Sequence, residues 1–248
     1  MARLLGEVIS ILSGKGGTGK TTLCAALATC LAEQGNRVLC IDLDVGLRNL
    51  DIALGMADEA AISFTDVLHG RYSMRDATPH PVLPNLFLLT APLREEDVAC
   101  DEAFGPLIAQ AKEYYDYCLM DAPAGVSVGF RLSSRYADRV VVVATPDPAS
   151  LRDAARVSEL LSIEQKEDVC LAVNRIRPRF FAKTKLTVDD MMDSTGLPLL
   201  GLIPDDANVP LSAFRGVPLI FSAKKGAAEA CRRMAQRLCG KMVPLMKF

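Results

Sequence analysis

Residues 13–22 of the chain read SGKGGTGKTT and directly follow the apolar run VISIL at 8–12. Within this stretch, Gly14-x-x-x-x-Gly19-Lys20-Thr21 matches the complete phosphate-loop pattern. The context is also typical, because a predicted strand precedes the loop and a predicted helix follows it. The stretch therefore predicts a strand, a glycine loop and a helix that together bind phosphate groups.

The loop itself supplies most of the predicted nucleotide contacts. Its glycines let the backbone turn N–H groups inward around phosphate oxygens, and the start of the helix adds its positive end. Lys20 can then reach the β- and γ-phosphates, and the Thr21 hydroxyl can bind Mg²⁺. The predicted contacts of this loop are Gly14, Lys15, Gly16, Gly17, Thr18, Gly19, Lys20, Thr21 and Thr22.

Carboxylates end two further apolar runs, VLCIDLD (38–44) and YCLMD (117–121). A single Asp at a strand end can be only a helix cap or a turn residue, but two strand ends converging on a phosphate loop indicate a magnesium site. We assign Asp42 and Asp121, with Thr21, to the Mg²⁺ ion. Asp44 lies further out on a loop, where we expect it to orient the attacking water. Phosphoryl transfer to water needs positioning and charge neutralisation more than a strong base, so these residues predict Mg²⁺-dependent hydrolysis of a nucleoside triphosphate.

Short apolar runs alternate with amphipathic segments along the whole chain. Most of these runs are continuously apolar, as is typical of strands that are covered on both faces in a parallel sheet. We therefore predict a doubly wound α/β fold of the P-loop NTPase class, with a mostly parallel sheet and helices on both faces. The predicted strands are Val8–Leu12, Arg37–Ile41, Leu86–Thr90, Tyr117–Met120, Arg139–Ala144, Val169–Val173 and Leu199–Ile203, and the clearest helices are Thr21–Gln34, Glu95–Lys112 and Ser150–Ser162.

Composition is consistent with one cytoplasmic domain. The chain has 248 residues, of which 50% are hydrophobic and 23% charged, enough for a large buried core. Eight cysteines form no C-x-x-C pair, and there are only two histidines, so we expect reduced thiols and no metal centre built from protein ligands alone. Neither a signal peptide nor an apolar run long enough to cross a bilayer is evident.

Charge is unevenly distributed. From residue 224 to the end there are seven Lys and Arg against one Glu, a net charge of +6, so residues 1–223 carry −8. An acidic body of this kind is a poor general nucleic-acid binder. We therefore expect no specific nucleic-acid partner.

The phosphate loop carries two lysines, although one is sufficient. Lys15 taken alone could be a solvated surface lysine. However, KGGTGKTT (15–22) resembles the deviant Walker A loop of the MinD/ParA superfamily. The resemblance implies that Lys15 crosses a dimer interface to the nucleotide of the other subunit, where it adds positive charge to the transition state as an arginine finger does. It implies a homodimer in the ATP state, with Lys15, Lys20 and Asp44 as the catalytic residues.

Within this superfamily, DLDVGLRNLD (42–51) is similar to the switch segment of the MinD family of septum-positioning ATPases. The similarity continues through MDAPAG (120–125), residues 136–157, VNRIRP (173–178) and GLIPDDANV (201–209). DNA-partition ATPases of the ParA type usually have a D-x-D-P-Q-G form in the switch segment, and FlhG-type regulators of flagellar number typically have G-L-A-N at 46–49. Both types remain as alternatives.

The resemblance also implies further site residues. Asn174 hydrogen-bonds the adenine edge, and Arg175, Pro204 and Asp205 complete the nucleotide site. A surface that includes Arg48, Asn49 and Asp153 meets MinC- and MinE-like regulators. The simpler alternatives are that Asn174 only ends a strand and that Asp153 only favours the first turn of its helix.

The C-terminus forms the last predicted feature. The resemblance implies a terminal amphipathic membrane helix, but Gly240 and Pro244 interrupt it here, so we divide the chain into an ATPase domain (1–239) and a short tail (240–248). In one interpretation, the apolar residues of the tail insert among the headgroups of an anionic membrane. The protein would then bind the inner face of the cell membrane peripherally and reversibly. The alternative is a final helix packed on the sheet with a frayed end. The stripe residues are Cys231, Met234, Leu238 and Met242, the cations among them are Arg232, Arg233, Arg237, Lys241 and Lys247, and the inserting residues are Met242, Val243, Leu245, Met246 and Phe248.

Overall fold

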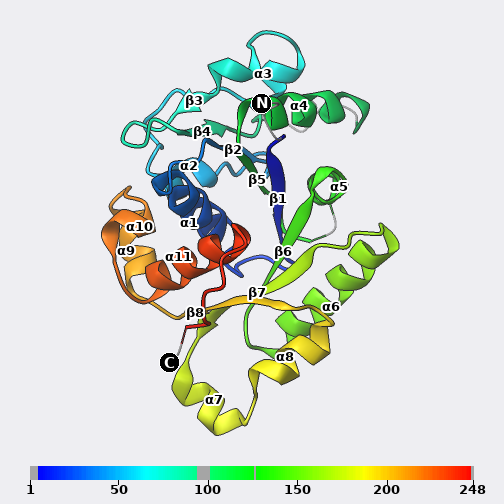
Figure 1. Cartoon of the computed structure of the whole chain (residues 1–248), viewed down its shortest axis with the longest axis vertical. Coiled ribbons are helices and arrows are strands. Elements are labelled where there is room, and N and C mark those ends of the chain that lie inside the picture. The colour runs from blue at the N-terminus through cyan, green and yellow to red at the C-terminus, as the bar shows by residue number, and fades with distance from the viewer. Residues whose placement is uncertain (1–4, 94–100, 126, 247–248) are drawn as a thin grey trace.

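The computed structural model describes residues 5–93, 101–125 and 127–246, and in this part of the chain eight strands form one sheet (Figure 1). The strand order is β3-β4-β2-β5-β1-β6-β7-β8, and all neighbouring pairs are parallel except β3 and β4. The doubly wound fold is thus confirmed. The strands are β1 (Glu7–Leu12), β2 (Val38–Asp42), β3 (Thr78–Pro79), β4 (Leu86–Leu89), β5 (Tyr117–Asp121), β6 (Arg139–Ala144), β7 (Val169–Ile176) and β8 (Leu199–Pro204).

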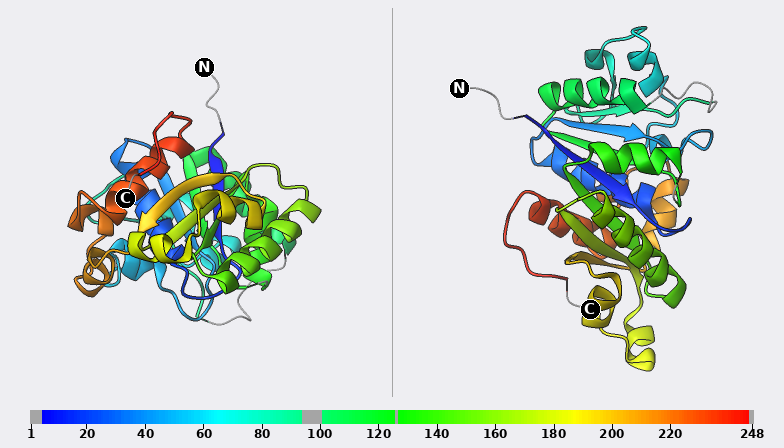
Figure 2. Two further views of the ribbon diagram at one scale, coloured as in Figure 1. Left: turned by 90° about the horizontal axis from the view of Figure 1, so that it is seen from below. Right: turned by 90° about the vertical axis from the view of Figure 1, so that its right-hand side faces the viewer.

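Helices cover both faces of this sheet (Figures 1 and 2). On one face, α1 (Lys20–Glu33), α2 (Leu50–Leu54), α10 (Leu219–Ser222) and α11 (Ala227–Leu238) pack on alternate strand residues such as Ile9 and Ile11. On the other face, α3 (Phe64–Leu68), α4 (Asp101–Tyr114), α5 (Val128–Tyr136), α6 (Pro148–Ile163) and α8 (Val188–Thr195) pack on residues such as Val8 and Leu12. The remaining elements are a 3₁₀ turn η1 (Met74–Asp76), α7 (Pro178–Thr184) and α9 (Asn208–Phe214).

The seven predicted strands are all present, with ends that differ by up to three residues. The sequence analysis missed β3, a two-residue antiparallel edge strand that contains Pro79. Proline lacks a backbone donor and is tolerated mainly at sheet edges, which explains why no strand signal is visible there. The predicted helix Glu95–Lys112 corresponds to α4, and its residues 95–100 lie outside the described residues.

Buried cysteines contribute to both layers of the core. Among the described residues, all seven cysteines are free, and six of them are buried, including Cys40, Cys118 and Cys170 in the strands. These three cysteines therefore act as small core residues. None of the helices in the described part of the chain is long and apolar enough to span a membrane.

The C-terminal helix α11 packs against α1 and β8. Its stripe residues Cys231, Met234 and Leu238 are buried in the core, so these three face the protein interior. The alternative of a final packed helix is confirmed for residues 227–238. Met242 lies beyond the end of the helix and is fully exposed.

After α11 the chain turns back and runs beside β8 (Figure 2). Arg237 donates hydrogen bonds to the backbone oxygens of Leu199 and Val243, and Arg233 donates one to that of Pro244. Arg232 likewise donates to the backbone oxygens of Ile220 and of the two residues that follow α10. Three of the cations that the sequence analysis places near a membrane therefore form hydrogen bonds within the protein. Lys247 and Phe248 lie outside the described residues.

The buried side chain of His80 links the end of α2 to the turn that directly follows His80 in the chain. His80 is only 4% exposed, its Nε2 lies 2.9 Å from the Leu54 oxygen, and its Nδ1 accepts hydrogen bonds from the N–H groups of Val82 and Leu83. These partners require a neutral ring with its proton on Nε2. Burial lowers the pKa of His80 below its ordinary value.

This arrangement predicts a histidine-specific loss of stability in acid. Because the folded-state pKa of His80 is depressed, the unfolded chain binds the proton more readily, and the stability that neutral His80 contributes is lost as the pH falls below about 6.5. At pH 7.5, His80→Gln should lower the free energy of unfolding by roughly 1–3 kcal/mol, because buried N–H and C=O groups lose their partners. In urea titrations, the gap between wild type and His80→Gln should shrink between about pH 7.5 and pH 5.5.

The second histidine provides the control. His69 is exposed at the end of α3, so His69→Gln should follow the wild-type pH dependence. A gap between wild type and His80→Gln that stays constant over this range would contradict the assignment of a neutral, clamping imidazole.

Candidate functional site

The phosphate loop connects the carboxyl end of β1 to the start of α1. Gly17 and Gly19 have φ values of 76° and 96°, in the left-handed region that glycine adopts without strain. Gly19 caps α1 with no side-chain hydrogen bond, and the first turn of α1 holds no acidic residue. The N–H groups and the positive end of this helix are therefore available to an anion.

Lys20, Thr21 and two carboxylates meet beside this loop. Asp42 and Asp121 lie opposite each other on the adjacent strands β2 and β5, and each is 1% exposed. The Thr21 hydroxyl lies beside Asp121 and lowers the pKa of its carboxyl group, against the effect of burial. Lys20 is 7% exposed and faces Asp121 and Asp44. The predicted convergence of the two strand ends on the loop is thus present.

The positive charge of Lys20 only partly neutralises the buried carboxylates of Asp42 and Asp121. Burial raises the pKa of Asp121 to about 7 and that of Asp42 to about 6, and it lowers the pKa of Lys20. One lysine therefore does not compensate the desolvation of two carboxylates. A further cation at this position would stabilise their ionised forms.

The donor set fits Mg²⁺. Within the described residues, Asp121 Oδ1 is a buried oxygen without a hydrogen-bond partner, and it belongs to the carboxylate that Thr21 contacts. No group of three or more His, Cys, Asp or Glu side chains that could hold a metal occurs in the described part of the chain. Mg²⁺ does not need one, because it takes one or two carboxylates and completes its shell with phosphate and water oxygens.

Asp42 also shapes the loop that follows β2. Its two carboxylate oxygens accept hydrogen bonds from the N–H groups of Asp44 and Leu50, at 2.9 and 3.2 Å. These contacts fix residues 43–49 between β2 and α2. Asp44 is half-buried on this loop, and burial raises its pKa while Lys20 lowers it. Asp44 is thus near the lysine of the phosphate site but outside the buried cluster.

The two lysines of the loop have different environments. Whereas Lys20 is buried, the side chain of Lys15 is 37% exposed and lies 3.1 Å from Asp147 Oδ1, at the start of α6. Lys15 thus interacts with a carboxylate on another element and does not join the cluster around Lys20. This contrast is the structural counterpart of the two roles that the sequence predicts.

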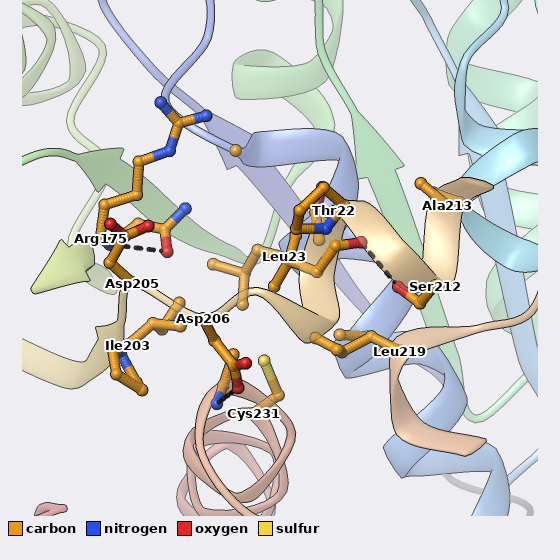
Figure 3. A pocket seen from close by; sticks show the side chains of 18 of the residues that line it. Thr22, Leu23, Arg175, Ile203, Asp205, Asp206, Ser212, Ala213, Leu219 and Cys231 are labelled. Carbon is orange, nitrogen blue, oxygen red and sulfur yellow. Dashed lines mark hydrogen bonds between the residues drawn. The ribbon is translucent and has the colours of Figure 1, made fainter. Parts of the chain in front are cut away.

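A cavity of about 390 Å³ lies beside the loop and α1 (Figure 3). It is lined by the predicted base-site residues Asn174, Arg175, Pro204 and Asp205, and also by Gly19 and Thr22. In Figure 3, Arg175 and Asp205 lie on one side of the cavity and Ser212 and Leu219 on the other. The nucleotide residues that the sequence predicts from distant segments are therefore brought together.

Asn174 has an additional contact that the sequence did not indicate. Its side-chain N–H donates to the Thr18 oxygen at 2.8 Å, and its Oδ1 accepts from the backbone of Arg175. A side chain at position 19 would collide with the Asn174 amide. Asn174 therefore fixes the phosphate loop in addition to lining the cavity.

Several lining residues were missed. Arg177 donates to Asp205 at 2.6 Å, and Asp206 accepts from the N–H group of Ala227 at the start of α11. Both belong to the quoted segments VNRIRP and GLIPDDANV, which could have identified them. Val209 also belongs to GLIPDDANV. The remaining missed residues lie on helices and carry no local signal: Leu23, Ala26, Ala53, Pro210, Ser212, Ala213, Leu219, Ala227 and Cys231.

The three predicted partner-surface residues differ in exposure. Asn49 is exposed, whereas Arg48 and Asp153 are half-buried. Arg48 donates to the Thr90 hydroxyl at 2.8 Å, and Asp153 lies directly against Gly14 of the phosphate loop. The structure thus places Asp153 next to the phosphate loop, whereas Arg48 is joined to Thr90, directly after β4.

Comparisons with known proteins agree with this geometry. The chain is 37% identical to the septum site-determining protein MinD of Synechocystis sp., over 98% of this chain and 93% of the relative. It is 36% identical to MinD of Bacillus subtilis, over 97% and 92%. Among solved structures, it resembles MinD in the MinC:MinD cell division complex of Aquifex aeolicus, with a TM-score of 0.91 at 36% identity over 98% and 99% of the two chains.

A second solved structure contains the nucleotide product. MinD of Pyrococcus horikoshii in complex with Mg-ADP matches with a TM-score of 0.83 at 29% identity, over 94% of this chain and 96% of that one. A family model described as the CobQ/CobB/MinD/ParA nucleotide binding domain matches residues 9–219. The chain therefore belongs to the CobQ/CobB/MinD/ParA nucleotide-binding family.

Proposed function

We propose that this protein is an ATP-hydrolysing switch that dimerises when it binds ATP, cycles on and off the cell membrane and positions the division septum. The observation that carries the proposal is the meeting of buried Lys20, half-buried Thr21 and buried Asp121 at the start of α1, with one carboxylate oxygen of Asp121 unpaired. Similarity to MinD over nearly the whole chain supports the cellular role.

Each residue of the cluster has a task toward ATP. The N–H groups of the loop and of the first turn of α1 hold the phosphates, and Lys20 neutralises their charge. Thr21 and Asp121, together with Asp42, would hold Mg²⁺, which supplies charge neutralisation on the phosphate oxygens when bound. Asp44 orients the water for in-line attack, for which a carboxylate outside the buried cluster is suited.

The cavity beside α1 would hold the adenine. Asn174 remains the proposed partner of the adenine edge, since one of its side-chain N–H groups and further acceptor capacity on its oxygen are free of the contacts described above. Pro204 and Asp205 pack beside the base, and Arg175 lines the entrance.

Catalysis would depend on assembly through Lys15. This lysine is half-exposed and separate from the buried cluster of its own subunit. In the ATP dimer it would contact the nucleotide of the other subunit and add positive charge to the transition state. ATP hydrolysis would then be slow in the monomer and fast in the dimer.

Two kinds of partner complete the proposed cycle. One is a MinC- or MinE-like regulator at a surface that includes Arg48, Asn49 and Asp153, which lies beside the switch segment and the phosphate loop. The relative from Aquifex aeolicus forms a complex with MinC. The other is the anionic inner surface of the cell membrane, reached through the tail, in which Met242 is fully exposed.

Replacing the two lysines should separate nucleotide binding from dimerisation. Lys20→Ala should weaken ATP binding on the order of 100-fold or more, because the phosphates lose a buried charged donor. Lys15→Ala should bind ATP as wild type does, remain monomeric and lose turnover by about 10³–10⁵-fold, as removal of an arginine finger does. Nucleotide titration, sedimentation velocity and phosphate release measure the three properties.

Lys183, exposed on α7, offers a matched control, and Lys183→Ala should behave as wild type in all three assays. Equal losses of ATP affinity in Lys15→Ala and Lys20→Ala would contradict the proposed division of roles.

Removing residues 240–248 should abolish ATP-dependent sedimentation with vesicles that contain anionic lipid, and it should leave dimerisation intact. A short tail binds weakly, but two tails on one dimer reinforce each other because the second engages at high effective concentration. Wild type should sediment with the vesicles in ATP, leave them in ADP and bind less in high salt.

A point variant guards against effects of the truncation on folding. Met242→Asp changes a fully exposed side chain, so it should leave the thermal unfolding temperature unchanged and weaken vesicle binding. Vesicle binding that persists in both variants, or that is the same in ATP and ADP, would exclude the tail as the anchor.

A further inference from the structure

Four exposed apolar side chains gather on α9, α10 and the turn between them. Leu211 and Phe214 belong to α9, Val217 lies on the turn and Phe221 belongs to α10, with exposed fractions of 46, 92, 37 and 39%. Because the two helices are in contact, we treat the four side chains as one surface, called the α9–α10 surface. Large apolar side chains are normally buried, so a group of them on the outside indicates contact with a partner.

The buried side of the same two helices holds this surface in place. Ser212 on α9 and Leu219 on α10 are each 4% exposed, and the Ser212 hydroxyl donates to the Val209 oxygen at 2.8 Å. Both residues line the cavity beside α1, as Figure 3 shows. The exposure of Phe214 is therefore a property of the folded body of the protein, at the outer wall of the proposed adenine cavity.

Cations accompany the apolar side chains. Residues 207–228 contain Arg215, Lys224 and Lys225 and no acidic residue, so this segment carries a net charge of +3. All three cations are exposed. In the part of the chain that the structure describes, none of them forms an ion pair with a carboxylate. The α9–α10 surface thus combines exposed apolar groups with uncompensated positive charge.

Two carboxylates near the lysines are already engaged with other groups. Asp205 and Asp206 line the same open hollow as Lys224 and Lys225. Asp205 forms an ion pair with Arg177, and Asp206 accepts hydrogen bonds from two backbone N–H groups, those of residues 208 and 227. The positive charge beside α10 therefore remains available to an external anion.

An anionic membrane matches both properties of this surface, because its headgroups supply negative charge directly above an apolar layer. We propose that the α9–α10 surface is a second membrane-binding site, which inserts Phe214 between the headgroups of anionic lipids. Arg215, Lys224 and Lys225 contact the headgroups around it. This inference rests on the proposed function, in which the cell membrane is a partner.

The α9–α10 surface and the tail lie on the same side of the molecule. In Figure 1 and in the left panel of Figure 2, α9, α10 and the segment that follows α11 are all on the left-hand side. One membrane can therefore contact both sites. Each site alone binds weakly, but contact at one raises the effective concentration of lipid at the other. The second site would offset the shortness of the tail.

Charge and apolar variants should weaken vesicle binding by different amounts. Full burial of a Phe side chain contributes roughly 10- to 100-fold to an equilibrium, and each cation near an anionic surface contributes about 5-fold. Phe214→Asp should weaken ATP-dependent sedimentation with vesicles of phosphatidylglycerol and phosphatidylcholine by at least about 10-fold. Lys224→Gln and Lys225→Gln together should weaken it by about 25-fold at low salt. These exposed positions should leave ATP affinity and the thermal unfolding temperature unchanged.

Fluorescence tests insertion directly. The chain contains no tryptophan, so Phe214→Trp introduces a single tryptophan into the α9–α10 surface. In ATP, its emission should shift to shorter wavelength when the vesicles are added, and phosphatidylcholine with brominated acyl chains should quench it. Ile163→Trp is the matched control, since Ile163 is 77% exposed at the end of α6, in the other helix layer. Its emission should not change.

The outcomes separate this inference from the proposed function. If Phe214→Trp is not quenched and Phe214→Asp sediments as well as wild type does, the inference is wrong and the proposed membrane cycle stands. If wild type itself does not sediment in ATP, the membrane is not a partner, and the proposed cycle is wrong together with the inference. If Phe214→Asp prevents ATP-dependent dimerisation without vesicles, the surface is an interface between two copies of the chain, which also contradicts the inference.

Discussion

Burial of opposite charges at the carboxyl edge of the sheet is the constraint on which the rest of the site depends. Lys20, Asp42 and Asp121 are almost inaccessible to water, and isolated charges in such a position are unfavourable. Burial raises the pKa values of both carboxylates and lowers that of the lysine, so the cluster is only partly compensated within the protein. Phosphate oxygens bound to Lys20 and a divalent cation bound to Asp121 would neutralise these buried charges. Binding of the nucleotide would therefore also stabilise the folded protein.

The sequence predicted the scaffold of this site because the scaffold is local. Continuous apolar runs identified the strands, and the glycine pattern identified the loop between β1 and α1. The opposition of Asp42 and Asp121 followed from parallel strands that end at one edge. The roles of Asn174 toward Thr18 and of Asp147 toward Lys15 could not be predicted, since each joins segments more than one hundred residues apart. Helix α11 shows the same limit: the sequence predicts its arginines as cations near a membrane surface, but tertiary packing turns Arg233 and Arg237 toward backbone oxygens.

Assembly and catalysis are connected in this account through the position of one ammonium group. Lys20 is fixed by burial, whereas Lys15 is half-exposed, pairs with Asp147 and is proposed to reach the nucleotide of a second subunit. If Lys15 acts in this way, a free subunit binds nucleotide but hydrolyses it slowly, so the rate of hydrolysis depends on protein concentration.

Complementation between two inactive variants tests most directly whether Lys15 acts across the dimer. A Lys15→Ala subunit retains Asp44 and its own nucleotide site, and an Asp44→Ala subunit retains Lys15. If Lys15 acts in the partner, the mixed dimer contains one complete site, and an equimolar mixture should hydrolyse ATP well above the sum of the two variants measured alone. If Lys15 acts in its own subunit, neither site is complete, and a mixture no more active than that sum would contradict the account.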